Sequence, residues 1–202
     1  IDSLEPSLVK KFVETGDSRG FIHFYQYGKL IPMKSTFPPD TVLAWPTIYT
    51  GLIHQRFDLK PEPESLHEMK NIALEMREKL MGKTFWDIAS QLGKRVCVIT
   101  PLFAYPPWKV NGIMVSGPSF GISGPTLSYP LIKNITDYKL GTYGKTPLLF
   151  NEYREMYAET IDQMLDVFEL TEVIINKSPY DLVFVADYTL DRIQHYFWRF
   201  YD

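Results

Sequence analysis

An aspartate and a histidine four residues apart follow an apolar run near the end of the sequence. Asp191 and His195 come after Leu182–Ala186, and their spacing places both side chains on one face of a helix. A carboxylate and an imidazole one turn apart can bind a metal ion such as zinc at about 2.0–2.2 Å. The same spacing is also common in capped, solvated helical turns, so the pair alone leaves both interpretations open.

Thr41 is the candidate nucleophile. It could cap a helix that runs towards Gly51, and a hydroxyl there lies among free backbone N–H groups at the positive end of the helix dipole. Such a position binds phosphate, and a metal that lowers the pKa of the hydroxyl would make Thr41 a nucleophile. The alternative is an ordinary N-cap. Pro46 conflicts with both interpretations because it removes a backbone donor from the proposed helix.

Asp2 is a further candidate metal ligand. The pair Glu5-Pro6 predicts a helix that starts near Pro6. An aspartate at the carboxyl end of a strand is well placed to bind a metal, whereas an aspartate in a strand–helix turn more often caps the helix. Taken alone, Asp2 is better explained as a cap.

Helical and apolar patterns predict the elements that position these residues. Residues 66–80 and about 151–176 repeat apolar side chains at helical spacing, and Thr84 with Asp87 predicts a capped short helix. The continuous apolar runs at 96–99 and 182–186 are typical of parallel strands covered on both faces. Ligands of such sheets bind at the carboxyl ends of the strands.

This alternation predicts the fold class. We expect a layered α/β/α sandwich with a mostly parallel central sheet, formed by residues 1–202 as a single α/β domain. Residues 100–150 contain several Pro and Gly turn signals, so we expect an irregular insertion or cover segment there.

Composition excludes several classes of protein. The 202 residues are 45% hydrophobic and carry a net charge of -3, which suits a folded domain and gives no electrostatic footprint for a nucleic-acid polymer. No apolar run is long enough for a membrane span. Cys97 is the single cysteine, so an intrachain disulfide and a cysteine-rich zinc site are excluded. A lone cysteine fits a reducing compartment, and we expect a cytoplasmic protein.

Taken in order, these segments resemble the type I phosphodiesterase and nucleotide pyrophosphatase family of the alkaline phosphatase superfamily. Asp2 resembles the family's first metal ligand, and Thr41, nine residues before Thr50, occupies the place of its nucleophile. Asp191 and His195 are similar to the family's Asp and His that bind a single metal ion. Further similar segments, some of them typical of the prokaryotic branch, are Pro39–Trp45, Gly93–Val96, Tyr105–Pro107 and Gln194–Trp198.

The resemblance implies an alkaline-phosphatase-like fold and a metal-dependent hydrolase of phosphodiester or nucleotide pyrophosphate bonds. Its cofactors would be two divalent metal ions, zinc first, with manganese or iron as alternatives. One ion would be held by Asp191 and His195, the other by Asp2, and Thr41 would form a threonyl-phosphate intermediate. The partner would be a small phosphorylated substrate, for example a nucleotide. Nothing in the sequence fixes the oligomeric state.

The sequence also departs from the family pattern. Ala44 stands where characterised nucleotide pyrophosphatases have an asparagine that helps to hold the phosphate, and His54 does not match the family's histidine. The later Asp-His-Gly motif and final histidine have no counterpart, so we expect the chain to be an amino-terminal portion. The alternatives are a phosphomonoesterase or phosphomutase of the same superfamily, or a noncatalytic domain without the second half of the metal site. A threonine at position 41 argues against a sulfatase.

Overall fold

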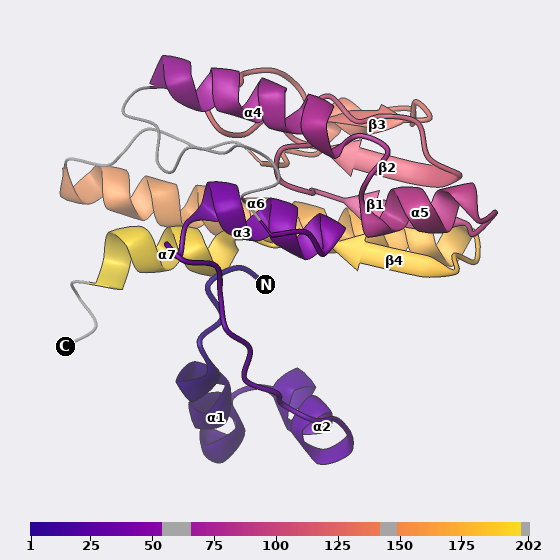
Figure 1. The fold of residues 1–202 in the computed structure, drawn as a ribbon. Helices are drawn as coiled ribbons and strands as arrows, with labels where there is room; N and C mark the ends of the chain where they lie inside the picture. Colours follow the sequence, from indigo (N-terminus) through magenta and orange to yellow (C-terminus); the bar gives the residue numbers. More distant parts are fainter. Residues whose placement is uncertain (54–65, 142–148, 199–202) are drawn as a thin grey trace. The chain divides into compact units, whose positions relative to one another are not determined.

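The computed structural model describes residues 1–53, 66–141 and 149–198 (Figure 1). The interpretation of His54 therefore lies outside the described residues. In chain order the elements are α1 (Pro6–Thr15), α2 (Arg19–Tyr27), α3 (Thr41–Thr50), α4 (Leu66–Leu80), α5 (Phe85–Gln91), β1 (Val96–Ile99), β2 (Gly112–Ser116), β3 (Leu127–Tyr129), the 3-10 helix η2 (Ile135–Asp137), α6 (Phe150–Lys177), β4 (Leu182–Val185) and α7 (Thr189–Phe197).

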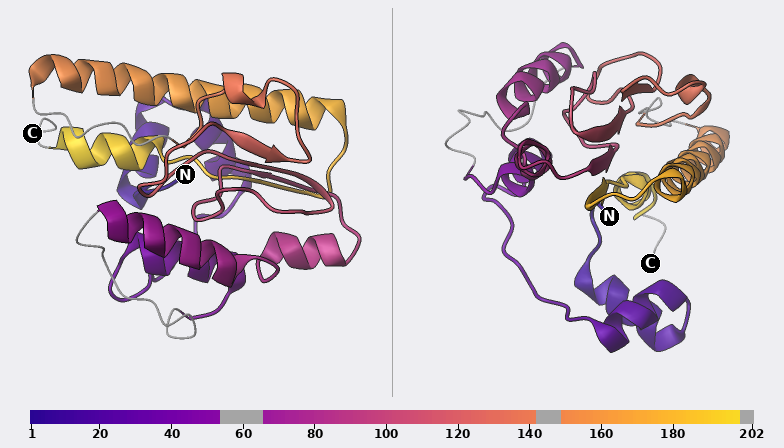
Figure 2. Two further views of the ribbon diagram at one scale, coloured as in Figure 1. Left: turned by 90° about the horizontal axis from the view of Figure 1, so that it is seen from above. Right: turned by 90° about the vertical axis from the view of Figure 1, so that its right-hand side faces the viewer.

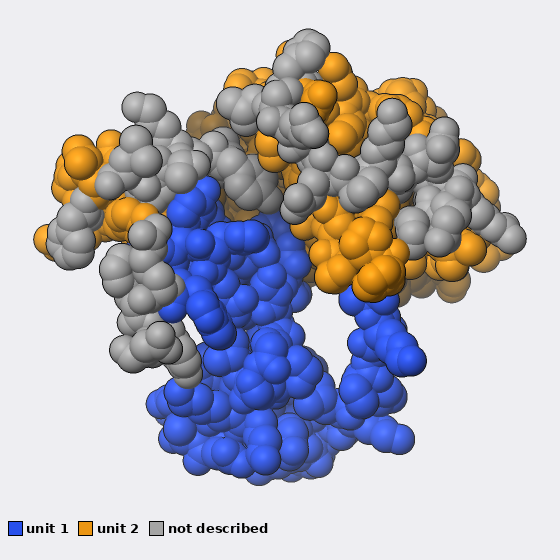
Figure 3. All heavy atoms as spheres, turned by 60° about the vertical axis from the view of Figure 1, so that its left-hand side comes forward, with its two compact units in different colours: residues 1–35, 188–202 blue, residues 36–187 orange. Residues whose placement is uncertain are grey.

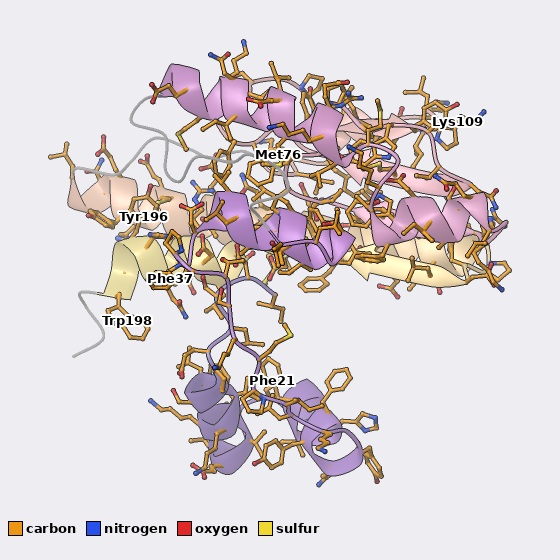
Figure 4. All side chains as sticks on the ribbon, viewed as in Figure 1. Phe21, Phe37, Met76, Lys109, Tyr196 and Trp198 are labelled. Atoms are coloured by element: carbon orange, nitrogen blue, oxygen red, sulfur yellow. The ribbon has the colours of Figure 1, made fainter. Side chains whose placement is uncertain are left out.

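The chain forms two compact units, which Figure 3 shows in different colours. Unit 1 consists of residues 1–35 and 188–202, and unit 2 consists of residues 36–187. Unit 1 holds α1, α2 and α7, whereas unit 2 holds the sheet and the remaining helices. The prediction of a single domain over residues 1–202 stays a prediction.

The described strands of unit 2 form one mixed sheet in the order β3-β2-β1-β4. Strand β1 pairs in parallel with both β2 and β4, and β3 runs antiparallel to β2. Every residue of β1 is buried, as expected for a short β-branched run at the centre of a parallel sheet. The mostly parallel sheet predicted from the sequence is confirmed.

Helices cover both faces of this sheet. On one face, Cys97 and Ile99 of β1 belong to a core cluster with Leu170 and Ile174 of α6. On the other face, Phe184 of β4 packs among aromatic side chains from α3 and α5. Figure 2 shows α6 on one side of the sheet and α3, α4 and α5 on the other. The α/β/α layering predicted from the alternating patterns is therefore confirmed.

The buried cysteine belongs to this core. Cys97 has no exposed surface, and burial raises the pKa of its thiol to about 11. A thiol with such a pKa is protonated at neutral pH and is a poor nucleophile. Cys97 therefore contributes packing rather than chemistry.

Two parts of the sheet differ from the sequence expectation. Strand β4 lies at the edge of the described sheet, and Val183 is 46% exposed, so the apolar run is not covered on both faces. Residues 100–150, expected to be irregular, contribute β2 and β3. Strand β2 starts at Gly112, where a Cβ would lie 2.0 Å from the carbonyl oxygen of Val96. Glycine therefore permits the close pairing of β2 with β1 at this position. The sequence Asn111-Gly112 on its own is typical of a turn.

A buried carboxylate fixes the start of α5. Asp87 Oδ2 accepts hydrogen bonds from the backbone N–H groups of Gly82 and Thr84, at 2.9 and 3.1 Å, and from the Thr84 hydroxyl at 2.6 Å. Asp87 Oδ1 accepts the indole N–H of Trp108 at 2.8 Å. The predicted cap is confirmed as a capping box. The hydrogen bond from Trp108 therefore also links the loop after β1 to α5.

We expect Asp87→Ala to lower the free energy of unfolding by about 3 kcal/mol, because it removes a cap and leaves buried donors without an acceptor. Urea denaturation of purified variants measures the change. Asp137→Ala is the matched control, since Asp137 is exposed in the first turn of η2. An unchanged midpoint for Asp87→Ala would show that this carboxylate does not stabilise the fold.

Candidate functional site

Helix α7 presents the predicted pair of metal ligands. Asp191 lies in its first turn and His195 in its last turn, and His195 Nε2 lies 3.5 Å from Asp191 Oδ1. Two atoms that bind one tetrahedral metal at 2.0–2.2 Å lie about 3.3–3.6 Å apart. The donor types and their separation therefore fit a single zinc-like ion.

The first residues of the chain contact helix α7 within unit 1. The Ser3 hydroxyl donates a 2.5 Å hydrogen bond to Asp191 Oδ1. Gln194 Nε2 donates to the Ser3 carbonyl oxygen at 3.2 Å, and the Ser3 N–H donates to Asp2 Oδ1 at 2.9 Å. Two segments nearly 190 residues apart in sequence, each with a predicted metal ligand, are thus joined through one serine.

The structure contradicts the interpretation of Asp2 as a helix cap. Helix α1 begins at Pro6, as predicted, but its N-cap is Glu5. Asp2 lies in a turn, and its carboxylate accepts a hydrogen bond from the neighbouring Ser3 N–H. Metal binding by Asp2 stays a prediction.

Helix α3 corrects the predicted cap at Thr41. The N-cap is Asp40, whose Oδ1 accepts a 2.7 Å hydrogen bond from Val42 N–H, and Thr41 is the first helical residue. Aspartate and threonine are both good caps, and here the aspartate takes that position. One N–H group that we expected to bind phosphate therefore already has a carboxylate acceptor. The Thr41 side chain is exposed.

Helix α3 is held firmly against the sheet of unit 2. It continues through Pro46 and ends at Gly51, whose φ of 68° gives a left-handed C-cap. Tyr49 has no exposed surface, and its hydroxyl accepts a 2.9 Å hydrogen bond from Leu102 N–H, just after β1. Its ring also contacts Trp86, with centroids 4.8 Å apart. Thr41 therefore begins a rigidly packed helix.

The predicted site residues divide between the two units. Asp2, Asp191 and His195 belong to unit 1, and Thr41 belongs to unit 2. The convergence of Thr41 with the three candidate ligands stays a prediction. Across residues 1–53, 66–141 and 149–198, no group of three or more His, Cys, Asp or Glu side chains is placed to hold a metal ion. Metal binding by Asp191 and His195 stays a prediction, and a complete site would need at least one more ligand.

A comparison with family models identifies the group to which the chain is related. The model for type I phosphodiesterase / nucleotide pyrophosphatase matches residues 1–200. The chain belongs to this family. Searches of curated proteins and of solved structures gave no match.

Membership of the type I phosphodiesterase family implies a phosphoric ester hydrolase that acts on a small phosphorylated substrate. The mixed sheet flanked by helices is consistent with the alkaline-phosphatase-like fold expected for this family. In the part of the chain that the structure describes, no helix is both long and apolar enough to cross a membrane.

Unit 2 of this phosphodiesterase-family chain contains a cavity of about 660 Å³. Arg95 and Tyr180, which line it, precede β1 and β4, so the cavity is at the amino ends of the strands. None of the four predicted site residues lines it. Ligands of open α/β sheets bind at the carboxyl ends, and we therefore do not assign the chemistry to this cavity.

Sequence reasoning missed two polar residues next to the candidate site residues. Asp40 precedes Thr41, and its signal was available because Asp is among the best N-cap residues. Ser3 gave no comparable signal, since its hydrogen bond to Asp191 joins distant parts of the chain.

Proposed function

We propose that the protein hydrolyses phosphodiester or nucleotide pyrophosphate bonds by way of a threonyl-phosphate on Thr41. Two divalent metal ions, zinc first, are the proposed cofactors. The observation that carries the proposal is the 3.5 Å separation of the His195 and Asp191 donor atoms on α7, in a chain that belongs to the type I phosphodiesterase family.

Each residue has a proposed role in binding. Asp191 and His195 hold one ion, and Asp2 contributes to the other. When bound, the ions supply positive charge that lowers the pKa of the threonine hydroxyl and stabilises the phosphoryl oxygens. Each ion needs further ligands besides these. The substrate is a small diester or a nucleotide.

Thr41 carries the proposed covalent step. Its Oγ1 gives its proton to water and attacks phosphorus, so that a P–O bond forms. The bond from phosphorus to the leaving-group oxygen breaks, and that oxygen takes a proton from water. Water then attacks the threonyl-phosphate, which releases the phosphorylated product and returns the threonine hydroxyl. The rigid packing of α3 through Tyr49 supports this role, because a nucleophile needs a fixed position relative to phosphorus.

Paired chromogenic substrates test the reaction class. We expect the protein with zinc to hydrolyse bis-p-nitrophenyl phosphate faster than p-nitrophenyl phosphate, and to lose this activity in EDTA. A preference for the monoester would favour the phosphomonoesterase alternative. Zinc binding without turnover of either ester would favour the noncatalytic domain.

A further inference from the structure

We infer that Ser3 is a positioning residue that holds the Asp191 carboxylate for a divalent cation and connects it to Asp2. The inference rests on the proposed function, because it takes Asp191 and His195 as ligands of one ion. It assigns to the serine a role that neither the sequence pattern nor the family match assigns.

Among the described residues, the hydrogen bonds of Ser3 join it to the two segments that carry proposed ligands. Its hydroxyl donates to Asp191 Oδ1 at 2.5 Å, and its carbonyl oxygen accepts from Gln194 Nε2 at 3.2 Å, so it binds α7 at two points. Its N–H donates to Asp2 Oδ1 at 2.9 Å. A residue with side-chain and main-chain bonds to α7 fixes the distance between that helix and its own segment.

The hydroxyl acts on the carboxylate oxygen that faces the histidine. Asp191 Oδ1 is both the acceptor of the Ser3 hydroxyl and the atom 3.5 Å from His195 Nε2. A hydroxyl–carboxylate bond of this length is of the strong, charge-assisted kind. Hydrogen bonds to a ligating carboxylate orient it, and losing such a partner usually weakens metal binding 10–100-fold.

The backbone of Ser3 supports a specific use of the side chain. Its φ is 55°, in the left-handed region, which glycine adopts at less cost than serine. Glycine would preserve this backbone but would lack the donor to Asp191. Ser3 therefore occupies a strained backbone position, and the hydrogen bond identified for its side chain is to the proposed ligand Asp191.

Calorimetric titration of the purified protein with Zn²⁺ measures the effect directly. We expect Ser3→Gly to weaken zinc binding about 10-fold or more, although its backbone is relaxed. Ser3→Asn should recover most of the affinity, because asparagine tolerates left-handed φ and offers an amide N–H donor. Ser7→Ala is the matched control, since Ser7 donates to the Glu5 carboxylate in the same unit, and its affinity should equal that of the wild type.

The outcomes separate this inference from the proposed function. If the wild type binds zinc and Asp191→Asn does not, the result supports the metal site. In that case, an unchanged zinc affinity in Ser3→Gly would contradict the role of Ser3 without contradicting the metal site. If the wild type and Asp191→Asn bind zinc equally, the metal site itself fails, and the role of Ser3 fails with it. Circular dichroism of the metal-free variants checks that each is folded. Equal losses in Ser3→Gly and Ser3→Asn would also contradict the inference, because both would then report only a disturbed turn.

Discussion

Thr41→Ala is expected to reduce the diesterase kcat by about 10⁴-fold or more, because the nucleophile is removed. The fold of α3 should survive, since Asp40 remains as its N-cap and Tyr49 as its buried contact. Zinc binding should also survive, because the proposed ligands lie on other segments. Steady-state kinetics with a chromogenic diester, beside zinc calorimetry, measures both properties.

Two variants serve as controls for Thr41. Thr41→Ser keeps a hydroxyl and should keep a substantial part of the activity. Thr47→Ala lies on the same helix and removes a hydroxyl that donates to the carbonyl oxygen of Leu43 at 2.8 Å, so its activity should stay near that of the wild type. Normal diesterase activity in Thr41→Ala would show that another group attacks phosphorus.

Asp191→Asn and His195→Gln are expected to raise the dissociation constant for zinc by more than about 100-fold, because each loses one direct ligand of a two-ligand half-site. Diesterase activity should fall as the zinc occupancy of the site falls, and it should recover in part at high zinc concentration. Thr41→Ala should instead bind zinc normally, and this contrast separates metal binding from the covalent step. Metal analysis after dialysis, together with calorimetry, gives the measurement.

Glu14→Gln is the control for these ligand variants. Glu14 also lies in unit 1, where it pairs with Lys10 at 3.7 Å on the exposed surface of α1. Its replacement removes a carboxylate without touching α7, so zinc affinity should not change. An equal loss of affinity in Glu14→Gln would indicate nonspecific binding to surface carboxylates. Unchanged affinity in Asp191→Asn would remove the basis of the proposed site.

The regular elements could be predicted because local patterns determine them. The helical spacing of apolar side chains predicted α4 and α6, and the continuous apolar run of β1 predicted a strand buried on both faces. The capping box of α5 was readable because both of its residues lie within four positions of each other. In each case the deciding interactions are within one element or with a generic apolar core.

Strand β2 could not be predicted because pairing, rather than local pattern, determines it. Its five residues begin with Gly112, next to an apparent turn, and lie between segments rich in Pro and Gly. The parallel register with β1, in which Val96 pairs with Gly112 and Ile99 with Val115, establishes the strand together with its antiparallel pairing with β3. Short strands that depend on such nonlocal hydrogen bonds carry little signal in their own sequence.

The candidate site was predictable in its parts but not in its connections. The spacing of Asp191 and His195 indicated a shared helix face, and their 3.5 Å approach agrees with it. The cap of α3 was assigned to Thr41 instead of Asp40, because the two neighbouring residues are both suited to that position. The Ser3 bond to Asp191 depends on tertiary structure, and no periodicity could reveal it.

A crystal structure of the protein grown with zinc, with anomalous scattering recorded at the zinc edge, tests metal binding by α7 next to Thr41 most directly. We expect an anomalous peak about 2.0–2.2 Å from a carboxylate oxygen of Asp191 and from a ring nitrogen of His195. We also expect Thr41 Oγ1 within about 4 Å of a bound ion. A peak that touches neither residue, or a Thr41 hydroxyl far from every bound ion, would contradict it.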